Sequence, residues 1–164
     1  MNPEELRDAV CRLLDEKKAA DITVLDVGGL TVLADYFIVA GGTSATNVKA
    51  LAGYVEEKLS GAGVEPLRKE GLRDARWVVY DYGSVIVHIL LDDMRLVYCL
   101  EQLWNNGKNL KKYGGDGADN NGETVNKTAN ETTDKTARKA AGKSGETSVE
   151  TANRKAVESM ESGG

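Results

Sequence analysis

The chain has 164 residues and a formal net charge of −5, with 21 Lys or Arg against 26 Asp or Glu. The whole acidic excess lies in residues 1–110, which hold 12 basic and 17 acidic side chains, because residues 111–164 hold nine of each. Binding a phosphate backbone requires clustered Lys and Arg, so an acidic domain disfavours direct nucleic-acid binding and suits a basic protein partner.

Composition also disfavours secreted and membrane proteins. Cys11 and Cys99 are too few for a disulfide framework, and Glu4, Glu5 and Asp8 interrupt the basic-then-apolar layout of a secretory signal. The longest apolar run is about half of the 18 residues that a bilayer-spanning helix needs. The sequence therefore predicts a soluble cytoplasmic protein that does not bind a membrane.

The composition changes sharply near Tyr113, which is the last aromatic residue. The following segment is rich in Gly, Thr, Asn, Ser, Lys and Glu. Such a segment cannot bury enough apolar surface to offset the ordering of its backbone, which costs roughly 1–2 kcal/mol per residue. We therefore expect a folded domain over residues 1–110 and a disordered, low-complexity tail over residues 111–164.

A helix is predicted at the start of the folded domain, over residues 3–18. Asn2 can cap it, Pro3 suits the first helical position, and Glu5 can complete a capping box. Alternating residues predict a first strand over 22–27, and an apolar run predicts a second over 35–40.

Small residues at 41–44 predict a turn into a second helix, with Thr43 or Ser44 as its N-cap. The apolar positions of this helix follow helical spacing and are Val48, Leu51, Ala52, Val55 and Leu59. Glycines at 61 and 63 end it, and residues 64–68 predict one short strand before Glu70-Gly71.

Residues 77–80 and 85–91 are apolar runs joined by a Gly-containing turn, which predicts a buried hairpin. Few of these positions are polar, so helices are expected on both faces of the sheet. Residues 94–104 predict one such helix, and the resulting order is α-β-β-α-β-β-β-α. Helical spacing places its leucines toward the core, at Leu96, Leu100 and Leu103, with Arg95, Tyr98 and Glu101 on other sides.

Residue types that carry chemistry do not form a catalytic pattern. His88 lies in an apolar run with no second His and no nearby Cys to complete a metal site, so a hydrogen-bonded structural histidine is favoured. Ser44 and Ser84 lack a nucleophile motif, and Cys99 has no obvious base. We expect no catalytic residue, no metal and no cofactor.

A series of short motifs is distributed over residues 2–110. The motifs are Asp35-Tyr36-Phe37-Ile38-Val39, Gly42-Thr43-Ser44 with Val48, Glu70-Gly71, Trp77, Asp81-Tyr82-Gly83-Ser84-Val85-Ile86-Val87-His88, Arg95 with Tyr98, Leu100-Glu101 and Leu103-Trp104. Each motif alone is weak. In this order and spacing, over about two thirds of the chain, they closely resemble the ribosomal silencing factor family, also called the Iojap-related family.

The resemblance implies an α/β (α+β) fold with a small mixed β-sheet flanked by helices, related to nucleotidyltransferases. It implies a translational repressor that binds the large ribosomal subunit through ribosomal protein uL14, on the face that meets the small subunit. Joining of the subunits would then be sterically blocked, and translation would fall when nutrients are scarce. Such a role requires a surface rather than a reaction centre, so the protein is expected not to be an enzyme.

Six residues are the candidates for partner binding: Trp77, Arg95, Tyr98, Glu101, Glu70 and Asp81. Trp, Tyr and Arg are enriched in interface hot spots, and carboxylates would attract a basic ribosomal protein. Structural alternatives remain open for several of them. Trp77 could belong to the core, Arg95 and Glu101 could form a solvated helix pair, and Asp81 could simply favour a turn.

Two other functions remain open. The turn at residues 41–44 resembles the Gly-Ser turn that holds phosphates in nucleotidyltransferases, but their metal-binding Asp-x-Asp pattern is missing and Asp92-Asp93 are adjacent. A self-associating module that closes a homodimer through exposed aromatic residues would be compatible with ribosome binding. Thr46 and Asn47 stand where the family often carries Arg, so the resemblance implies that a bidentate contact to carboxylate or phosphate would be missing at that edge.

Overall fold

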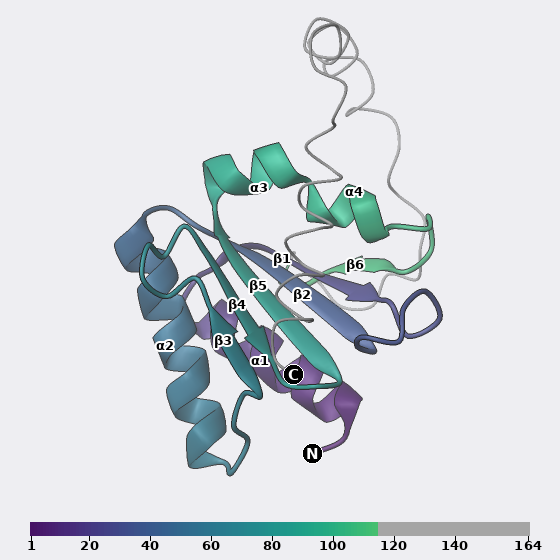
Figure 1. The fold of residues 1–164 in the computed structure, drawn as a ribbon, viewed down its shortest axis with the longest axis horizontal. Helices are drawn as coiled ribbons and strands as arrows, with labels where there is room; N and C mark the ends of the chain where they lie inside the picture. The colour runs from purple at the N-terminus through teal and green to yellow at the C-terminus, as the bar shows by residue number, and fades with distance from the viewer. Residues whose placement is uncertain (115–164) are drawn as a thin grey trace, which may run out of the picture. The chain divides into compact units, whose positions relative to one another are not determined.

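The computed structural model describes residues 1–114, which form one sheet and four helices (Figure 1). The elements in chain order are α1 (Pro3–Glu16), β1 (Ala20–Asp26), β2 (Tyr36–Gly42), α2 (Ala45–Gly61), β3 (Arg68–Glu70), β4 (Trp77–Asp81), β5 (Val85–Leu91), α3 (Asp92–Tyr98), α4 (Leu100–Trp104) and β6 (Leu110–Lys112). The strand order is β3-β4-β5-β2-β1-β6. Only β2 and β5 are parallel neighbours, so the predicted mixed sheet flanked by helices is confirmed.

Alternation along the central strand β5 separates the two faces of the sheet. Val85, Val87 and Ile89 belong to the core shared with α1 and α2, whereas Ile86, His88 and Leu90 alternate with them and point to the opposite face. Helix α1 contributes Val10 and Leu14 to this core and α2 contributes Val48, Leu51 and Val55, all at most 1% exposed. All of β5 except Leu91 is buried, which explains its nearly continuous apolar sequence.

Both predicted helix starts have the expected caps. The Asn2 carboxamide oxygen accepts from the Glu5 backbone N–H at 2.8 Å, and the Glu5 carboxylate accepts from the Asn2 N–H at 2.9 Å. Ser44 Oγ accepts from the backbone N–H of Asn47 at 3.1 Å. These bonds satisfy donors that the first turn of a helix leaves without intrahelical partners, so local sequence determines where α1 and α2 begin.

The predicted helix over residues 94–104 is wrong in its continuity and in its buried face. Cys99 adopts a left-handed conformation (φ 46°) and divides the segment into α3 and α4. Leu96 and Val97 are 79% and 57% exposed, whereas Leu100 is buried. The break rotates α4 relative to α3, so a single helical phase does not describe the positions of all these leucines.

Two strand predictions also change. The third strand is Arg68–Glu70 rather than residues 64–68, because Pro66 has no N–H to donate to a ladder and pairing with β4 starts at Arg68. The sequence missed β6, which pairs antiparallel with β1. This strand extends the sheet beyond residue 110, the predicted domain boundary. The predicted disordered tail, apart from residues 111–114, lies outside the described residues.

A glycine at position 71 is required by the tight connection between β3 and β4. Gly71 has φ +77°, and a Cβ there would lie 1.8 Å from the carbonyl oxygen of Trp77. Only glycine accommodates both the left-handed conformation and this close approach. Within residues 1–114, none of the helices is both long and apolar enough to cross a bilayer.

Candidate interaction surface

A row of aromatic rings crosses the sheet face opposite α1 and α2. Trp77 of β4 lies 5.9 Å from His88 of β5 between ring centroids, and His88 lies 5.6 Å from Phe37 of β2. Each end of the row contacts a ring from a helix, because Tyr98 of α3 lies 4.9 Å from Trp77 and Trp104 of α4 lies 5.1 Å from Phe37. The row therefore joins three strands to both C-terminal helices.

The centre of this row is a buried hydrogen bond between two side chains. Trp77 is 7% exposed and His88 is 3% exposed, and the indole Nε1 donates to His88 Nδ1 at 3.2 Å. Burial lowers the pKa of His88 to about 4, so the ring is neutral at pH 7 and Nδ1 can accept. The predicted structural role of His88 is confirmed. Trp77 presents little surface to a partner directly and instead supports the ring of Tyr98.

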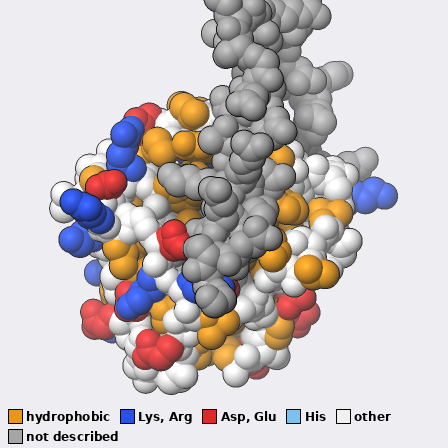
Figure 2. Space-filling model, viewed as in Figure 1, with side chains coloured by type: hydrophobic (Ala, Val, Ile, Leu, Met, Phe, Trp, Pro, Cys, Tyr) orange, Lys and Arg blue, Asp and Glu red, His pale blue; other side chains and the backbone are white. Residues whose placement is uncertain are grey.

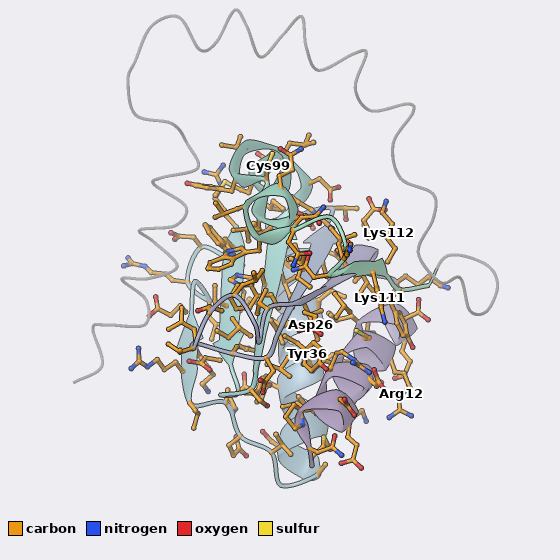
Figure 3. The ribbon with its side chains drawn as sticks, turned by 90° about the vertical axis from the view of Figure 1, so that its right-hand side faces the viewer. Arg12, Asp26, Tyr36, Cys99, Lys111 and Lys112 are labelled. Carbon is orange, nitrogen blue, oxygen red and sulfur yellow. The ribbon has the colours of Figure 1, made fainter. Side chains whose placement is uncertain are left out.

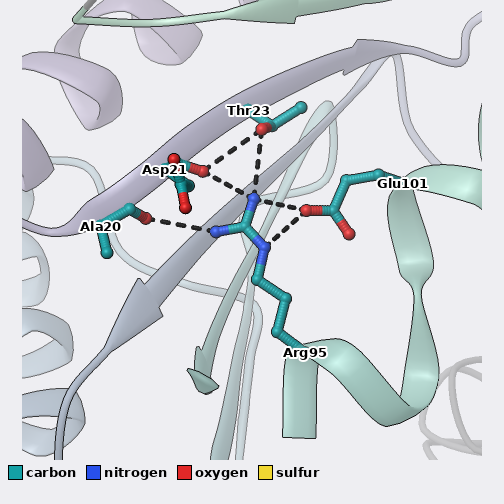
Figure 4. A network of polar contacts seen from close by, with 5 residues as sticks. All are labelled: Ala20, Asp21, Thr23, Arg95 and Glu101. Atoms are coloured by element: carbon teal, nitrogen blue, oxygen red, sulfur yellow. Dashed lines mark hydrogen bonds and ion pairs between the residues drawn. The ribbon is translucent and has the colours of Figure 1, made fainter. Parts of the chain in front are cut away.

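Arg95 links α3 to the start of β1 (Figure 4). Its guanidinium donates from Nη1 to the carbonyl oxygen of Ala20 at 3.2 Å, and from Nη2 to the carbonyl oxygen of Asp21 at 2.6 Å. Nη2 also lies 3.2 Å from Thr23 Oγ1, and Nε donates to the Glu101 carboxylate at 2.5 Å. The acceptors lie where the β1–β2 register shifts and Asp21 has φ 45°. Arg95 therefore fixes an irregular strand end against both short helices.

Arg95 and Glu101 are more enclosed than the solvated pair considered from the sequence. Their side chains are 14% and 20% exposed, and they form an ion pair as well as the hydrogen bond. A planar guanidinium can hold several oxygens at once, which a lysine ammonium on a flexible stem cannot reproduce. The structure thus brings these two candidates together as an internal brace, and their use by a partner stays a prediction.

The remaining acidic candidates lie on the β3–β4 side of the sheet. Glu70 is exposed and pairs with Val79 across the ladder, so it shares a sheet face with Trp77. Asp81 ends β4, and its carboxylate accepts from the Gly83 N–H at 2.7 Å, which confirms the turn role considered for it. Trp77 and Asp81 stand at opposite ends of β4, about 13 Å apart at strand spacing. The six candidates therefore do not form one compact cluster.

Sequence reasoning missed the exposed part of α3. Leu96 and Val97 present large apolar side chains to solvent next to Tyr98, and we call these three residues the α3 patch. Figure 2 shows hydrophobic side chains at this end of the domain. The sequence did contain a sign of this patch, because apolar residues occur on more than one side of the 94–104 segment. A helix that is apolar on several sides needs more than one surface to cover it. Exposed apolar patches commonly mark interaction sites.

The turn at residues 41–44 serves as a helix cap. Ser44 caps α2, and Asn47 Oδ1 accepts from the Thr43 N–H at 3.1 Å. A Cβ at Gly41 would meet the Asp92 carboxylate at 2.8 Å, so an acidic group lies beside the turn where a nucleotidyltransferase would hold phosphate. No group of three or more His, Cys, Asp or Glu suited to a metal ion is found among residues 1–114. The local geometry thus favours capping over phosphate binding at this turn.

Both cysteines are free thiols. Cys11 is buried, and burial raises the pKa of its thiol to about 12. Burial also raises the pKa of Cys99, although this residue is partly exposed. Raised thiol pKa values oppose thiolate formation near neutral pH, which is the opposite of what a nucleophilic cysteine needs.

These features define a small α/β domain with a braced pair of short helices and an exposed apolar patch. The chain belongs to the ribosomal silencing factor family: the family model described as "Ribosomal silencing factor during starvation" matches residues 1–148. The ribosomal silencing factor of Bacillus subtilis is similar at 36% identity over 104 residues, covering 63% of this chain and 88% of the relative.

Two further similarities extend this result to a solved structure and to a eukaryote. A crystal structure of a protein from Chromobacterium violaceum is similar with a TM-score of 0.62 and 40% identity, covering 63% of this chain and 87% of that one. A protein of Mus musculus named for mitochondrial assembly of the ribosomal large subunit is 33% identical over 100 residues, covering 59% of this chain and 44% of that protein. The crystal structure from Chromobacterium violaceum supports the fold directly, because a chain with 40% identical sequence adopts it.

Proposed function

We propose that the protein is a non-enzymatic translational repressor of the cytoplasm that binds the large ribosomal subunit through ribosomal protein uL14. Bound there, it would occupy the face that meets the small subunit and sterically block subunit joining when nutrients are scarce. Membership of the ribosomal silencing factor family carries this proposal. The name of the Mus musculus relative, which refers to the ribosomal large subunit, supports the same partner.

The described surface combines acidic side chains with exposed apolar ones, which suits a basic protein partner. Residues 1–110 carry the whole acidic excess of the chain, which would speed encounter with a basic ribosomal protein. The α3 patch supplies exposed apolar area, with Tyr98 held in place by Trp77. Arg95 and Glu101 hold α3 and α4 in position, while Glu70 and Asp81 would add acidic contacts elsewhere on the β3–β4 side of the sheet.

Co-sedimentation with purified large subunits tests this proposal. We expect the full-length chain and a form ending at Gly114 to co-migrate with large subunits and to lower formation of joined ribosomes from separated subunits. The shorter form ends there because β6 extends to Lys112. Failure of both forms to bind at moderate salt would contradict the proposal.

Matched variants locate the contact surface. Leu96→Asp and Val97→Asp should abolish co-sedimentation, because each places an unpaired charge in the α3 patch. Val32→Asp is the control, since Val32 is a fully exposed apolar residue in the loop between β1 and β2. Equal loss of binding in the control would show that the patch is not the contact. Analytical ultracentrifugation of the same variants reports on the homodimer, and lost self-association with intact subunit binding would assign the patch to dimerisation.

A further inference from the structure

A cavity of about 630 Å³ lies at the β6 edge of the sheet, far from the α3 patch. Its walls come from α1, β1, β2 and the segment leading through β6, and its lining includes Arg7, Asp26, Tyr36, Lys108, Lys111 and Lys112. In Figure 3, Asp26, Tyr36 and Lys111 lie on the α1 side of the domain and Cys99 lies at the other end. We call this space the β6 cavity. Its volume falls in the range of small-molecule sites, roughly 300–1,000 Å³.

The β6 cavity concentrates positive charge in an acidic domain. Lys108, Lys111 and Lys112 line it, and none of their side chains forms a hydrogen bond or ion pair with another residue of the 1–114 region. Arg7, in contrast, is paired with Asp8 at 2.7 Å. Lys111 and Lys112 are neighbours on β6, so their side chains point to opposite faces of the sheet: Lys111 pairs with the core residue Val24, and Lys112 pairs with Thr23, whose Oγ1 contacts Arg95 on the other face. Lys108 and Lys111 therefore remain as the unpaired cations of the cavity, and Asp26 is the one unpaired carboxylate among the described lining residues. This excess of cationic donors is what a multiply charged anion requires.

Hydrogen bonds between asparagine side chains and the backbone hold the segment leading through β6 in place. The Asn109 side-chain amide donates to the carbonyl oxygens of Asp26 at 2.8 Å and Trp104 at 2.9 Å. Asn106 Oδ1 accepts from the backbone N–H groups of Lys108 and Asn109, at 3.0 and 3.1 Å. Lys108 thus lies on a turn tied to β1, and Lys111 and Lys112 lie on a paired strand. A backbone fixed before binding lowers the ordering cost that a ligand would otherwise meet.

The opposite side of the β6 cavity offers an aromatic wall. The Arg7 guanidinium lies 4.8 Å from the centroid of the half-buried Tyr36 ring, and Val24 and the buried Cys11 also line the space. The Cys11 thiol, whose pKa is raised by burial, contributes an apolar surface rather than a nucleophile. The lining therefore combines cationic donors with aromatic and apolar groups, which suits binding and does not suggest a reaction.

We propose that the β6 cavity binds a small phosphate-bearing molecule, with the phosphate on Lys108 and Lys111 and an apolar or aromatic part toward Tyr36. A polynucleotide fits less well, because its phosphates require an extended basic track, whereas Lys108 and Lys111 line a single cavity in an acidic domain. Lysines on an edge strand can also serve only to prevent pairing with other strands. Binding measurements with small and polymeric probes distinguish a small-molecule site from a polynucleotide surface and from edge protection.

Isothermal titration of the full-length chain with inorganic pyrophosphate and with adenosine monophosphate tests the site. We expect both probes to bind, and Lys108→Gln and Lys111→Gln each to weaken both by about tenfold, the effect of losing one charge-assisted contact. Tyr36→Leu should weaken adenosine monophosphate and leave pyrophosphate unchanged. Lys49→Gln is the control, because Lys49 is an exposed lysine of α2 outside the cavity.

Three results would overturn the proposal. Absence of binding at millimolar probe would leave the lysines as edge protection only. An equal loss in Lys49→Gln would indicate attraction to overall charge rather than a site. Binding of a ten-nucleotide RNA together with no binding of adenosine monophosphate would assign the lysines to a polynucleotide surface. Thermal melts of each variant establish that it folds, and exposed Lys-to-Gln changes are expected to leave the melt unchanged.

Discussion

Trp77 and His88 lie on neighbouring antiparallel strands and are joined by a hydrogen bond from the indole Nε1 to His88 Nδ1. The bond fixes the histidine tautomer, because Nδ1 must lack a proton to accept and the neutral ring then carries its proton on Nε2. Trp77 also connects the sheet to α3, because its ring packs against the ring of Tyr98. Protonation of His88 would therefore disturb both the sheet and α3, the helix that carries the α3 patch.

We predict that folding stability falls with decreasing pH between about 6.5 and about 4. Burial lowers the pKa of His88 to about 4 in the folded protein, so over this window the unfolded chain binds more protons than the folded chain. The loss approaches about 3 kcal/mol at most, at roughly 1.4 kcal/mol per pKa unit. Urea denaturation followed between pH 7 and pH 5 measures about 2 kcal/mol of this loss, before most carboxylates titrate.

His88→Gln provides the control for the pH experiment, because glutamine keeps an acceptor for Trp77 but does not titrate. The variant should be less stable at pH 7, and its stability should change less between pH 7 and pH 5. His88 is the only histidine of the chain, so no other imidazole contributes to the slope. An unchanged slope in the variant would contradict the assignment to His88.

We predict that Arg95→Lys lowers the free energy of unfolding by roughly 1–3 kcal/mol. A lysine cannot serve the carbonyl oxygens of Ala20 and Asp21 and the Glu101 carboxylate together, so partly buried acceptors lose their donors. Hydrogen exchange should also accelerate in α3 and α4. Arg76→Lys is the matched control, because Arg76 is 58% exposed and lies 3.7 Å from Asp93, a contact worth a few tenths of a kcal/mol.

Sequence patterns predicted best those elements whose signals are local. Asn2, Pro3 and Glu5 form the predicted capping box, and Ser44 caps α2 as expected. The strands that became β4 and β5 were recognisable because they are buried and continuously apolar. The missed strand β6 has one apolar residue, Leu110, followed by two lysines, and it forms only because β1 offers a free edge. That requirement is tertiary and has no local pattern.

The error at α3 and α4 has a different physical cause. Left-handed backbone is usually predicted from glycine or asparagine, whereas here Cys99 adopts it. The network at Arg95 depends on partners more than 70 positions away in the chain, so its enclosure could not be inferred from spacing. Sequence patterns therefore predicted which residue types the candidate surface contains. They did not predict that Arg95 and Glu101 would be enclosed while the α3 patch would be exposed.

Truncation of Leu96 should cost far less stability than truncation of Leu100, although helical spacing places both on one face. Leu96→Ala should change the free energy of unfolding by less than about 0.5 kcal/mol because Leu96 is 79% exposed. Leu100→Ala should cost roughly 2–5 kcal/mol because Leu100 is 3% exposed. Chemical denaturation of both variants measures the difference, and equal costs would support one continuous helix with both leucines buried.

We predict that β6 is required for a stable domain, so a chain ending at residue 114 should be more stable than one ending at residue 109. The shorter chain loses the β1–β6 ladder and the bond from the Tyr113 N–H to the Ile22 carbonyl oxygen, which is 2.8 Å long. At roughly 1 kcal/mol for each backbone bond lost, the decrease should be about 3 kcal/mol. It should also leave β1 as an open edge that promotes aggregation. Denaturant melts and light scattering compare the two forms, and equal stability would place the end of the folded domain at residue 110, as the sequence predicted.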